Sequence, residues 1–189
     1  MTSLTFFDYT YCMAKNAREK IYEAFRSLSL KKKIDKITVT DITDLAGVSR
    51  VSFYYHFRSI YDLAINIIEE DLRARQVLPI AHEDCEKALL ILLEVIREHK
   101  ELVKKLMSSD GAETLYEHTR LWSRHLADAA LPECPLPVDE DAQKTILNFY
   151  RNAVVGAVWD WISDDCREDP QKLAFLLSNH LHNAYATRN

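Results

Sequence analysis

Apolar residues recur at every third or fourth position through most of the 189-residue chain, which is the repeat of amphipathic α-helices. A short example spans residues 39–46. Thr38 stands just before it, and its hydroxyl can accept a hydrogen bond from the free amides of a first turn, so a helix is predicted to begin at Val39. The side facing a core would hold Val39, Ile42, Leu45 and Ala46. The side facing solvent would hold Thr40, Asp41, Thr43 and Asp44.

A second short helix is predicted directly after a turn. Gly47 can adopt the left-handed backbone conformation that ends a helix and allows a sharp change of direction. Ser49 is another N-cap, which would open a helix over residues 50–56. In this helix Val51 and Tyr55 are predicted to face inward. The outer face would carry Arg50, Ser52, Tyr54 and His56.

A helix, a glycine-containing turn and a second helix with exposed hydrogen-bonding groups form a helix-turn-helix, which places its second helix in the major groove of DNA. Arg50 can bond a guanine edge through two donors, and Ser52 can donate or accept. Tyr54 and His56 can reach phosphate oxygens or a thymine methyl group. The alternative is a small helical hairpin with a packed, tyrosine-rich face and no role in binding.

The same stretch resembles the N-terminal domain of the tetracycline-repressor-like (TetR) family of regulators. The matching segments are ITVTDITDLAGVS, the aromatic run FYYHF from Phe53 to Phe57, and the following YDL. The resemblance implies that a set of residues contacts double-stranded DNA or orients the recognition helix: Thr38, Ser49, Arg50, Ser52, Tyr54, Tyr55 and His56. One position departs from the family pattern, because Ile60 stands where the family usually has a phosphate-binding lysine. Arg58 is the candidate to replace it.

Two further helices are predicted around this unit. The first would run from about Asn16 to Leu30, with basic residues that could meet the DNA backbone on its outer side: Lys15, Arg18 and Lys20. Ser59 would cap the second, which joins the head to the rest of the chain and is expected to end near Pro79. Residues 1–14 are aromatic without a clear period and are interpreted as an extension, or as an arm that packs on the body or on DNA.

The remaining chain predicts a helical body. Apolar stripes predict two helices that meet at a bend near residues 98–100, and a third with Leu115, His118, Leu121, Trp122, His125 and Leu126 on one side. The proline-spaced segment 131–137 reads as a loop, and helices follow over residues 139–163 and 170–185. The predicted fold is all-α with about nine helices, divided into an extension (1–14), a DNA-binding domain (15–66) and a dimerisation and ligand-binding domain (67–189).

The last two helices carry more apolar surface than one small body needs to bury, so a homodimer is predicted. They would pair with their copies as a four-helix bundle, which is the usual dimer of the resembling family; core packing within one chain is the alternative. The predicted interface comprises Ile146, Tyr150, Ala153, Val154, Ala157, Trp161, Leu173, Leu177 and Leu181. A dimer could read two half-sites about 34 Å apart.

The distribution of charge favours DNA as the partner of the N-terminal part. The chain carries a formal charge of −5, but residues 15–66 hold ten Lys or Arg against six Asp or Glu, which leaves +4 there and −9 on the remainder. Lys31, Lys32 and Lys33 could instead be a solvated helix end. The sequence has neither an apolar run of about 20 residues nor a signal peptide, so a cytoplasmic protein without membrane contact is expected.

Family members commonly bind a small-molecule effector in the second domain. The candidates for such a pocket are Met107, Tyr116, Trp122, Phe149 and Trp159, for which ordinary core packing is the alternative. The segments HKELVKKLM and VVGAVWDWISDD resemble a subgroup with a dihydroxyacetone-kinase-regulator-like C-terminal domain. Because some relatives there are activators or lack an effector pocket, the direction of control stays open, and a regulatory protein is a second candidate partner.

Other classes of function have weaker support in the sequence. Four cysteines, Cys12, Cys85, Cys134 and Cys166, are too scattered for a zinc site and are expected to be free thiols. His118 and His125 have no carboxylate or cysteine at metal-ligand spacing. No phosphate-binding loop or activated serine is present, so no enzyme, metal or cofactor is expected. A helical protein-interaction adaptor with a degenerate DNA-binding head is the remaining alternative, and it would lack salt-dependent DNA binding.

Overall fold

A computed structural model describes residues 6–130 and 139–186, with the side chains of 17–129 and most of 139–179. The described residues form ten α-helices and one 3-10 turn, and no strand. In chain order the elements are α1 (Phe6–Ser29), η1 (Ile34–Lys36), α2 (Val39–Ala46), α3 (Arg50–His56), α4 (Ile60–Ala74), α5 (Val77–Ala81), α6 (Cys85–Glu98), α7 (Lys100–Met107), α8 (Ala112–Ala130), α9 (Glu140–Ser163) and α10 (Pro170–Ala186). The all-helical class is as predicted, and the predicted loop 131–137 lies outside the described residues.

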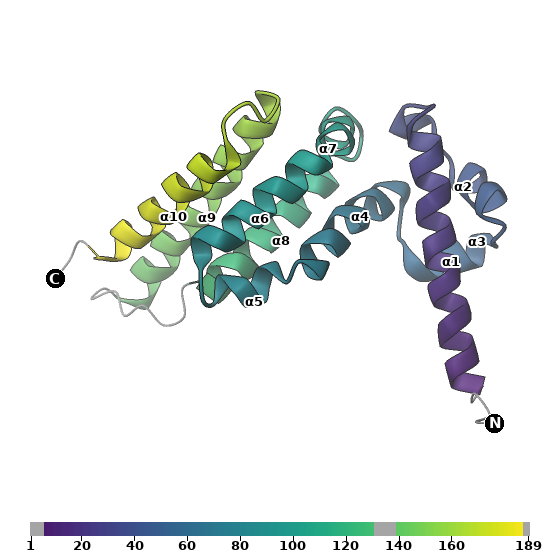
Figure 1. Cartoon of the computed structure of the whole chain (residues 1–189), viewed down its shortest axis with the longest axis horizontal. Helices are drawn as coiled ribbons and strands as arrows, with labels where there is room; N and C mark the ends of the chain where they lie inside the picture. The colour runs from purple at the N-terminus through teal and green to yellow at the C-terminus, as the bar shows by residue number, and fades with distance from the viewer. Residues whose placement is uncertain (1–5, 131–138, 187–189) are drawn as a thin grey trace.

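The molecule has a small head and a larger body, and α4 runs from one into the other (Figure 1). In the head, α1 packs against α2, α3 and the start of α4. Phe25, Phe53 and Phe57 are fully buried at the centre of these helices, and the rings of Tyr22 and Phe57 lie 5.5 Å apart. Burial of these aromatic side chains stabilises the head through the hydrophobic effect.

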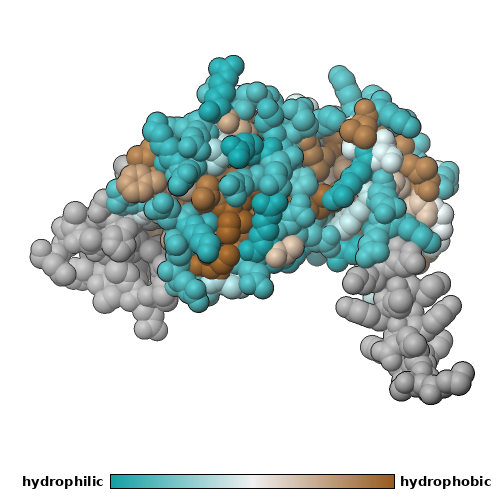
Figure 2. Space-filling model, viewed as in Figure 1, coloured by the Kyte–Doolittle hydropathy of each residue, from teal (hydrophilic) through white to brown (hydrophobic). Residues whose placement is uncertain are grey.

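In the body, α4 packs against α5, α6 and α8, while α10 lies on α6 and α9 lies on α8. The bend between α6 and α7 falls at His99, as the interrupted apolar stripe predicts. Polar side chains cover most of the face seen in Figure 2, and apolar ones show between them over both the body and the head. Cys85 and Cys166 are free thiols, and Cys12 and Cys134 lie outside the described side chains.

Helix α1 begins ten residues earlier than predicted, at Phe6 rather than near Asn16. Much of the predicted N-terminal extension is therefore helical. The prediction relied on apolar periodicity, which the aromatic residues 6–11 do not show. Neither glycine nor proline occurs between residues 6 and 29, so nothing in the sequence stops the helix from continuing toward the N-terminus. The division into domains at residues 15 and 67 stays a prediction.

The end of α4 was also predicted wrongly. The helix stops at Ala74, and Gln76 takes a left-handed backbone conformation with φ of 55°. Pro79 lies in the first turn of α5, where a missing N–H breaks no helical hydrogen bond because the first four amides of a helix have no partner within it. Pro79 is therefore compatible with a helix start rather than marking a helix end.

Two of the predicted dimer contacts are instead buried within the chain. Trp161 and Leu173 belong to the body core, and the indole nitrogen of Trp161 donates to the backbone oxygen of Glu168 at 2.9 Å. The other described interface candidates, Tyr150, Ala153, Val154, Ala157 and Leu177, are exposed or half-buried, while the side chains of Ile146 and Leu181 lie outside the described set. Leu121 and His125 of α8, predicted to face inward, are exposed.

Candidate nucleic-acid interface and ligand cavity

Helix α2 begins with a reciprocal pair of hydrogen bonds. The backbone N–H of Asp41 donates to Oγ1 of Thr38 at 3.0 Å, and the backbone N–H of Thr38 donates to the Asp41 carboxylate at 2.9 Å. The hydrogen bonds from Thr38, backbone first and then side chain, and the nearby Lys32 lower the pKa of the Asp41 carboxyl. Thr38 thus acts as the predicted cap, and its hydroxyl is already held by Asp41.

The turn after α2 depends on Gly47, whose φ of 64° and ψ of 37° are left-handed. Within α2, Ile42 is fully buried as predicted, but Leu45 is exposed and Thr43 is buried. The hydroxyl of Thr43 donates to the backbone oxygen of Thr40 at 3.2 Å, so this polar side chain can be buried with its hydrogen satisfied. A threonine that bonds its own helix in this way looks polar in the sequence and still packs inside.

Helix α3 starts where predicted, with the backbone N–H of Ser52 donating to the hydroxyl of Ser49 at 3.1 Å. Its inward face was assigned wrongly. Val51 and Tyr55 are 80% and 78% exposed, whereas Phe53 and, just after the helix, Phe57 are buried. Both pairs have helical spacing, so periodicity alone could not decide between them; the two phenylalanines lie inside because they are larger and wholly apolar.

The outer surface of α3 is consequently richer in apolar groups than predicted. Arg50, Val51, Tyr54 and Tyr55 are all exposed, and Ser52 and His56 are half-buried. Val51 is a candidate contact that the sequence reasoning missed, because it follows Arg50 on the exposed first turn and an aliphatic group can meet the methyl group of thymine. One short helix therefore presents a guanidinium group, two tyrosine hydroxyls and an aliphatic side chain to its surroundings.

His56 differs from the other candidates in charge. Burial lowers the pKa of its imidazole, and the positive charge of Arg18 lowers it further. A neutral ring lies here near pH 7, with its centroid 5.0 Å from that of Tyr55 and 6.0 Å from that of Phe57. His56 is therefore better suited to hydrogen bonding and packing than to attracting phosphate by charge.

Arg18 already has partners within the chain. Its guanidinium donates to the Tyr22 hydroxyl at 2.9 and 3.1 Å and forms an ion pair with Glu70 of α4 at 2.7 Å. The group also lies over the Phe57 ring, 5.7 Å from its centroid. These contacts tie α1 to α4, and a phosphate would have to compete with Glu70 for this arginine. The side chain of Lys15 lies outside the described set.

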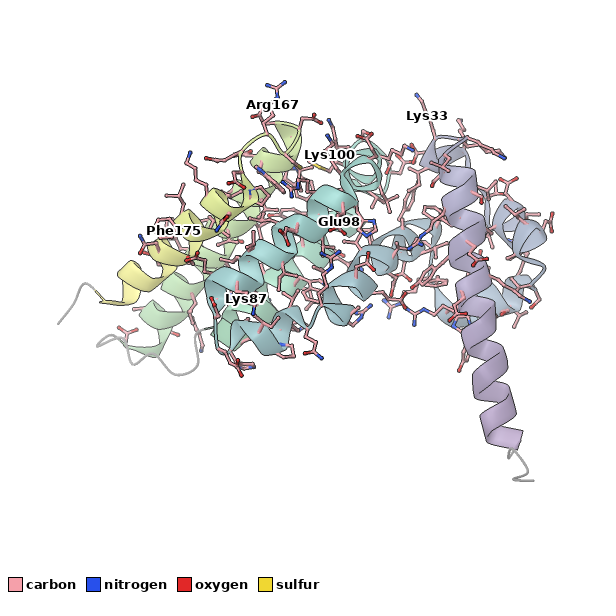
Figure 3. All side chains as sticks on the ribbon, in the orientation of Figure 1. Lys33, Lys87, Glu98, Lys100, Arg167 and Phe175 are labelled. Atoms are coloured by element: carbon pink, nitrogen blue, oxygen red, sulfur yellow. The ribbon has the colours of Figure 1, made fainter. Side chains whose placement is uncertain are left out.

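Ile60, which occupies the position of the usual lysine, packs against the apolar core at the start of α4. Arg58 is exposed, and its backbone N–H donates to the Asp62 carboxylate at 2.8 Å. Its side chain therefore stands on a part of the chain that the capped start of α4 fixes in place. Lys33 projects from the same head, near the end of α1 (Figure 3).

The body contains an apolar cavity of about 90 Å3 lined by residues from six helices, α4 to α9. Two of the predicted pocket residues, Trp122 and Trp159, line it. Met107, Tyr116 and Phe149 do not, and Phe149 is 67% exposed. The sequence reasoning missed the polar lining, which comprises Glu69, His118, Thr119 and Ser123. His118 was predicted on the inward side of its helix and was considered as a metal ligand, but not as a pocket residue, because its partner Glu69 is 49 residues away in the sequence.

Glu69 is the most strongly held of these polar groups. Its carboxylate is 2.8 Å from Nδ1 of His118 and 3.2 Å from the guanidinium of Arg73, and it also accepts a hydrogen bond from Trp122. Burial alone would raise the pKa of this carboxyl, but the bonds from His118 and Trp122 outweigh it and lower the pKa. The bond to Glu69 raises the pKa of His118 despite partial burial.

Three consecutive acids of α4 contact three different helices or helix junctions. Glu69 holds His118 of α8, Glu70 holds Arg18 of α1, and Asp71 lies 2.5 Å from Nε2 of His99 at the bend between α6 and α7. Side chains of successive helical residues point in directions about 100° apart. Within one turn, α4 therefore contacts both the head, through Glu70, and the body, through Glu69 and Asp71.

A second connection between head and body passes through Tyr61. Its hydroxyl donates to Asp35 of η1 at 2.9 Å, and burial followed by this bond raises its pKa to about 12. The ring lies against Gly111 in the turn between α7 and α8, where an added Cβ would come within 2.5 Å of the ring. Nearby, Lys105 of α7 donates to the backbone oxygen of Ser29 at 2.7 Å.

Within the described residues, no three or more His, Cys, Asp or Glu side chains are placed to hold a metal ion. No helix in that part of the chain is long and apolar enough to cross a bilayer.

Comparison with protein families gives two matches. The model of the transcriptional regulator C-terminal region matches residues 83–183, more than half of the chain, and the model of bacterial regulatory proteins of the tetR family matches residues 20–67. The chain belongs to the TetR family of transcriptional regulators. Proteins of this family are regulators and typically not enzymes, and the match at the head does not favour the adaptor alternative.

Solved structures of TetR-family regulators share the fold. The dihydroxyacetone kinase operon activator DhaS has a TM-score of 0.66 at 19% identity, covering 90% of this chain and 96% of that one. NalD, the secondary repressor of the MexAB-OprM efflux pump in Pseudomonas aeruginosa, has a TM-score of 0.52 at 18% identity, covering 89% and 95%. A regulator from Aquifex aeolicus has 0.51 at 20%, covering 88% and 98%. A search among curated proteins finds no match.

Proposed function

We propose that this TetR-family regulator reads its operator with α3, inserted into the major groove of double-stranded DNA. The observation that carries the proposal is the arrangement of α3, where buried Phe53 and Phe57 fix the helix while Arg50, Val51 and Tyr55 stand exposed. A helix anchored in this way presents its outer side chains at little cost in conformational entropy.

Each side chain has a distinct role in this proposal. Arg50 bonds a guanine edge, while Val51 and the aromatic residues contact thymine methyl groups and phosphates. Arg58 holds the phosphate backbone in place of the lysine that Ile60 replaces. Arg18 acts mainly by positioning α1 against α4, since Glu70 and Tyr22 already hold its guanidinium.

The test compares two arginines on duplexes selected from the organism's own DNA. Arg50→Ala should weaken specific binding by about 1–3 kcal/mol and relax the preference at one base position. Arg58→Ala should weaken binding to all sequences alike. It should also make the slope of log affinity against log salt concentration less steep by about one unit. Fluorescence anisotropy over a series of salt concentrations measures both effects, and a footprint unchanged by both variants would contradict the proposal.

We also propose that the regulator acts as a homodimer through α9 and α10, so that two copies of α3 reach successive major grooves. Support comes from exposed aromatic side chains on these helices: Phe149 is 67% and Phe175 is 50% exposed, and Phe175 lies on the outside of α10 (Figure 3). Burying such side chains between subunits would gain hydrophobic free energy. A single-chain mass from light scattering at micromolar concentration would count against the dimer.

Control by a small-molecule effector in the cavity beside α4 completes the proposal, with a regulatory protein as the alternative partner. It is supported by the position of Glu69, which lines the cavity and belongs to the helix that enters the head. A ligand that favours one placement of α4 would shift the DNA-binding equilibrium. The direction of control is open, since DhaS is named an activator and NalD a repressor.

A further inference from the structure

The composition of the cavity wall restricts the ligand that it can hold. Its wall is formed mainly by aliphatic side chains from six helices, α4 to α9, such as Leu72 of α4, Leu92 of α6, Leu126 of α8 and Val158 of α9. Such a wall offers no replacement for the water shell of a charged group, whose transfer costs several kcal/mol or more. The body of the ligand must therefore be hydrocarbon.

The polar corner of the cavity is already balanced in charge. The Glu69 carboxylate faces the imidazole of His118 and the guanidinium of Arg73, and the indole of Trp122 donates to it as well. A ligand carboxylate would meet Glu69, and a ligand ammonium would meet a protonated His118, while the charge of Glu69 is already compensated by its partners. The corner therefore favours a neutral polar group over an ion of either sign.

The hydroxyl groups of the corner are oriented by the helix. The hydroxyl of Thr119 donates to the backbone oxygen of Leu115 at 2.8 Å, and that of Ser123 donates to the backbone oxygen of Arg120 at 3.2 Å. Their hydrogens are occupied, so these oxygens act as acceptors toward a ligand. Together with the second ring nitrogen of His118, they suit a ligand group that can both donate and accept, which is what a hydroxyl does.

The volume of the cavity limits the size of the ligand. An engineered protein cavity of about 150 Å3 holds benzene, and this cavity measures about 90 Å3. A ligand of about four to six non-hydrogen atoms corresponds to this volume, with modest outward movement of side chains at the upper end.

We propose that the cavity binds a small neutral alcohol, with its hydrocarbon part against the aliphatic wall and its hydroxyl beside Thr119 and the Glu69–His118 pair. The inference rests on the proposed effector function of the same cavity and adds the chemical class. It makes Thr119 a residue that determines specificity for a hydroxyl over a charged group of the same size.

The test uses the full-length protein and three probes that share one four-carbon chain: 1-butanol, butyrate and n-butylammonium. Calorimetry or ligand-observed NMR should give 1-butanol a Kd of about 1–10 mM, which fits so few atoms. Either ion should bind at least about tenfold more weakly, because its charge must be desolvated. An ion that binds as tightly as 1-butanol, or no binding of 1-butanol up to about 50 mM, overturns the class.

A matched pair of substitutions locates the hydroxyl contact. Thr119→Val keeps the shape of the side chain and should weaken 1-butanol binding about three- to tenfold. Thr145→Val on α9 removes a hydroxyl that donates to the Asp141 backbone oxygen with the same four-residue spacing, at 2.9 Å, and it does not line the cavity. It should leave binding unchanged. Equal effects of the two substitutions would overturn the assignment of Thr119.

DNA titrations separate this inference from the proposal on which it rests. If 1-butanol binds with the expected preference and shifts DNA affinity, both stand. If it binds so but leaves DNA affinity unchanged, the ligand class stands and the effector role of the cavity fails. If one of the ions binds more tightly and shifts DNA affinity, the effector role stands and the ligand class fails.

Discussion

The head and the body are both helical, yet the contacts that determine them span very different distances along the chain. In the head, the hydroxyls of Thr38, Ser49 and Ser59 each cap a helix by accepting a hydrogen bond from the backbone N–H three residues further on. In the body, the cavity corner joins Glu69 to His118, 49 residues away. The helix starts of the head thus depend on residues a few positions apart, whereas the polar corner of the cavity forms only when distant segments meet.

Local capping residues determine where α2 and α3 begin, while distant segments determine which side of each helix is buried. Even in the head, the wrong side of α3 was assigned, because the ring that Phe57 meets belongs to Tyr22 of α1. A test of this distinction should therefore change faces and turns separately, in the head and in the body.

The largest effect is expected from α3. Phe53→Ala should lower the free energy of unfolding by about 3–5 kcal/mol, since it removes a fully buried ring. Tyr55→Ala, two positions along the same helix, should change it by less than about 0.5 kcal/mol because the side chain is exposed. Chemical denaturation measures both variants. Equal destabilisation by the two substitutions would contradict the orientation of α3 in which Phe53 is buried and Tyr55 is exposed.

The next largest effects are expected at two glycines of the body that differ in the space around them. Gly111→Ala should destabilise by about 1–3 kcal/mol, because the new Cβ would meet the Tyr61 ring. Gly156→Ala in α9 meets nothing within 4 Å and should stabilise by about 0.5–1 kcal/mol, as alanine favours a helix interior. Thermal and denaturant unfolding of both variants measure these changes in stability. A Gly111→Ala variant that is more stable than the wild type would contradict the close contact between Gly111 and the Tyr61 ring.

A smaller loss is expected at the turn of the head. Gly47→Ala should cost about 1–2 kcal/mol, since its left-handed backbone disfavours any residue with a Cβ. Because the turn sets the angle of α3, DNA affinity should fall as well, whereas the Gly111 variant should alter DNA affinity only through the placement of α4. Binding of both variants to one duplex, under conditions where each is fully folded, makes the comparison.

The smallest effects concern two histidines with opposite pH dependence. The pKa of His118 is raised, so its stabilisation is present below the unfolded value of 6.5 and is lost as pH rises through the higher folded value. The pKa of His56 is lowered, so it destabilises the fold as pH falls below 6.5. His118→Gln and His56→Gln should therefore change the slope of unfolding free energy against pH in opposite directions. A change of slope with the same sign in both variants would contradict the direction of the pKa shift for one of the two histidines.

What could be read from the sequence follows the same division. The bounds of α2 and α3, their caps and the turn at Gly47 were predicted correctly because each depends on residues within a few positions. Of the cavity lining, only Trp122 and Trp159 were predicted, because they are large and apolar, whereas Glu69 and His118 form a polar pair that only the fold brings together. Trp161 was predicted to lie in the dimer interface but is buried within the chain, because an apolar stripe does not reveal which chain covers it.

The run Glu69, Glu70 and Asp71 has a mechanical consequence. These three carboxylates contact partners on three different sides of α4. Rotation of α4 about its axis, in either direction, would therefore lengthen at least one of the three contacts. A shift of α4 along its axis relative to the head or the body would likewise lengthen at least one of the contacts. Any signal that moves α4 must therefore weaken at least one of the contacts made by Glu69, Glu70 and Asp71.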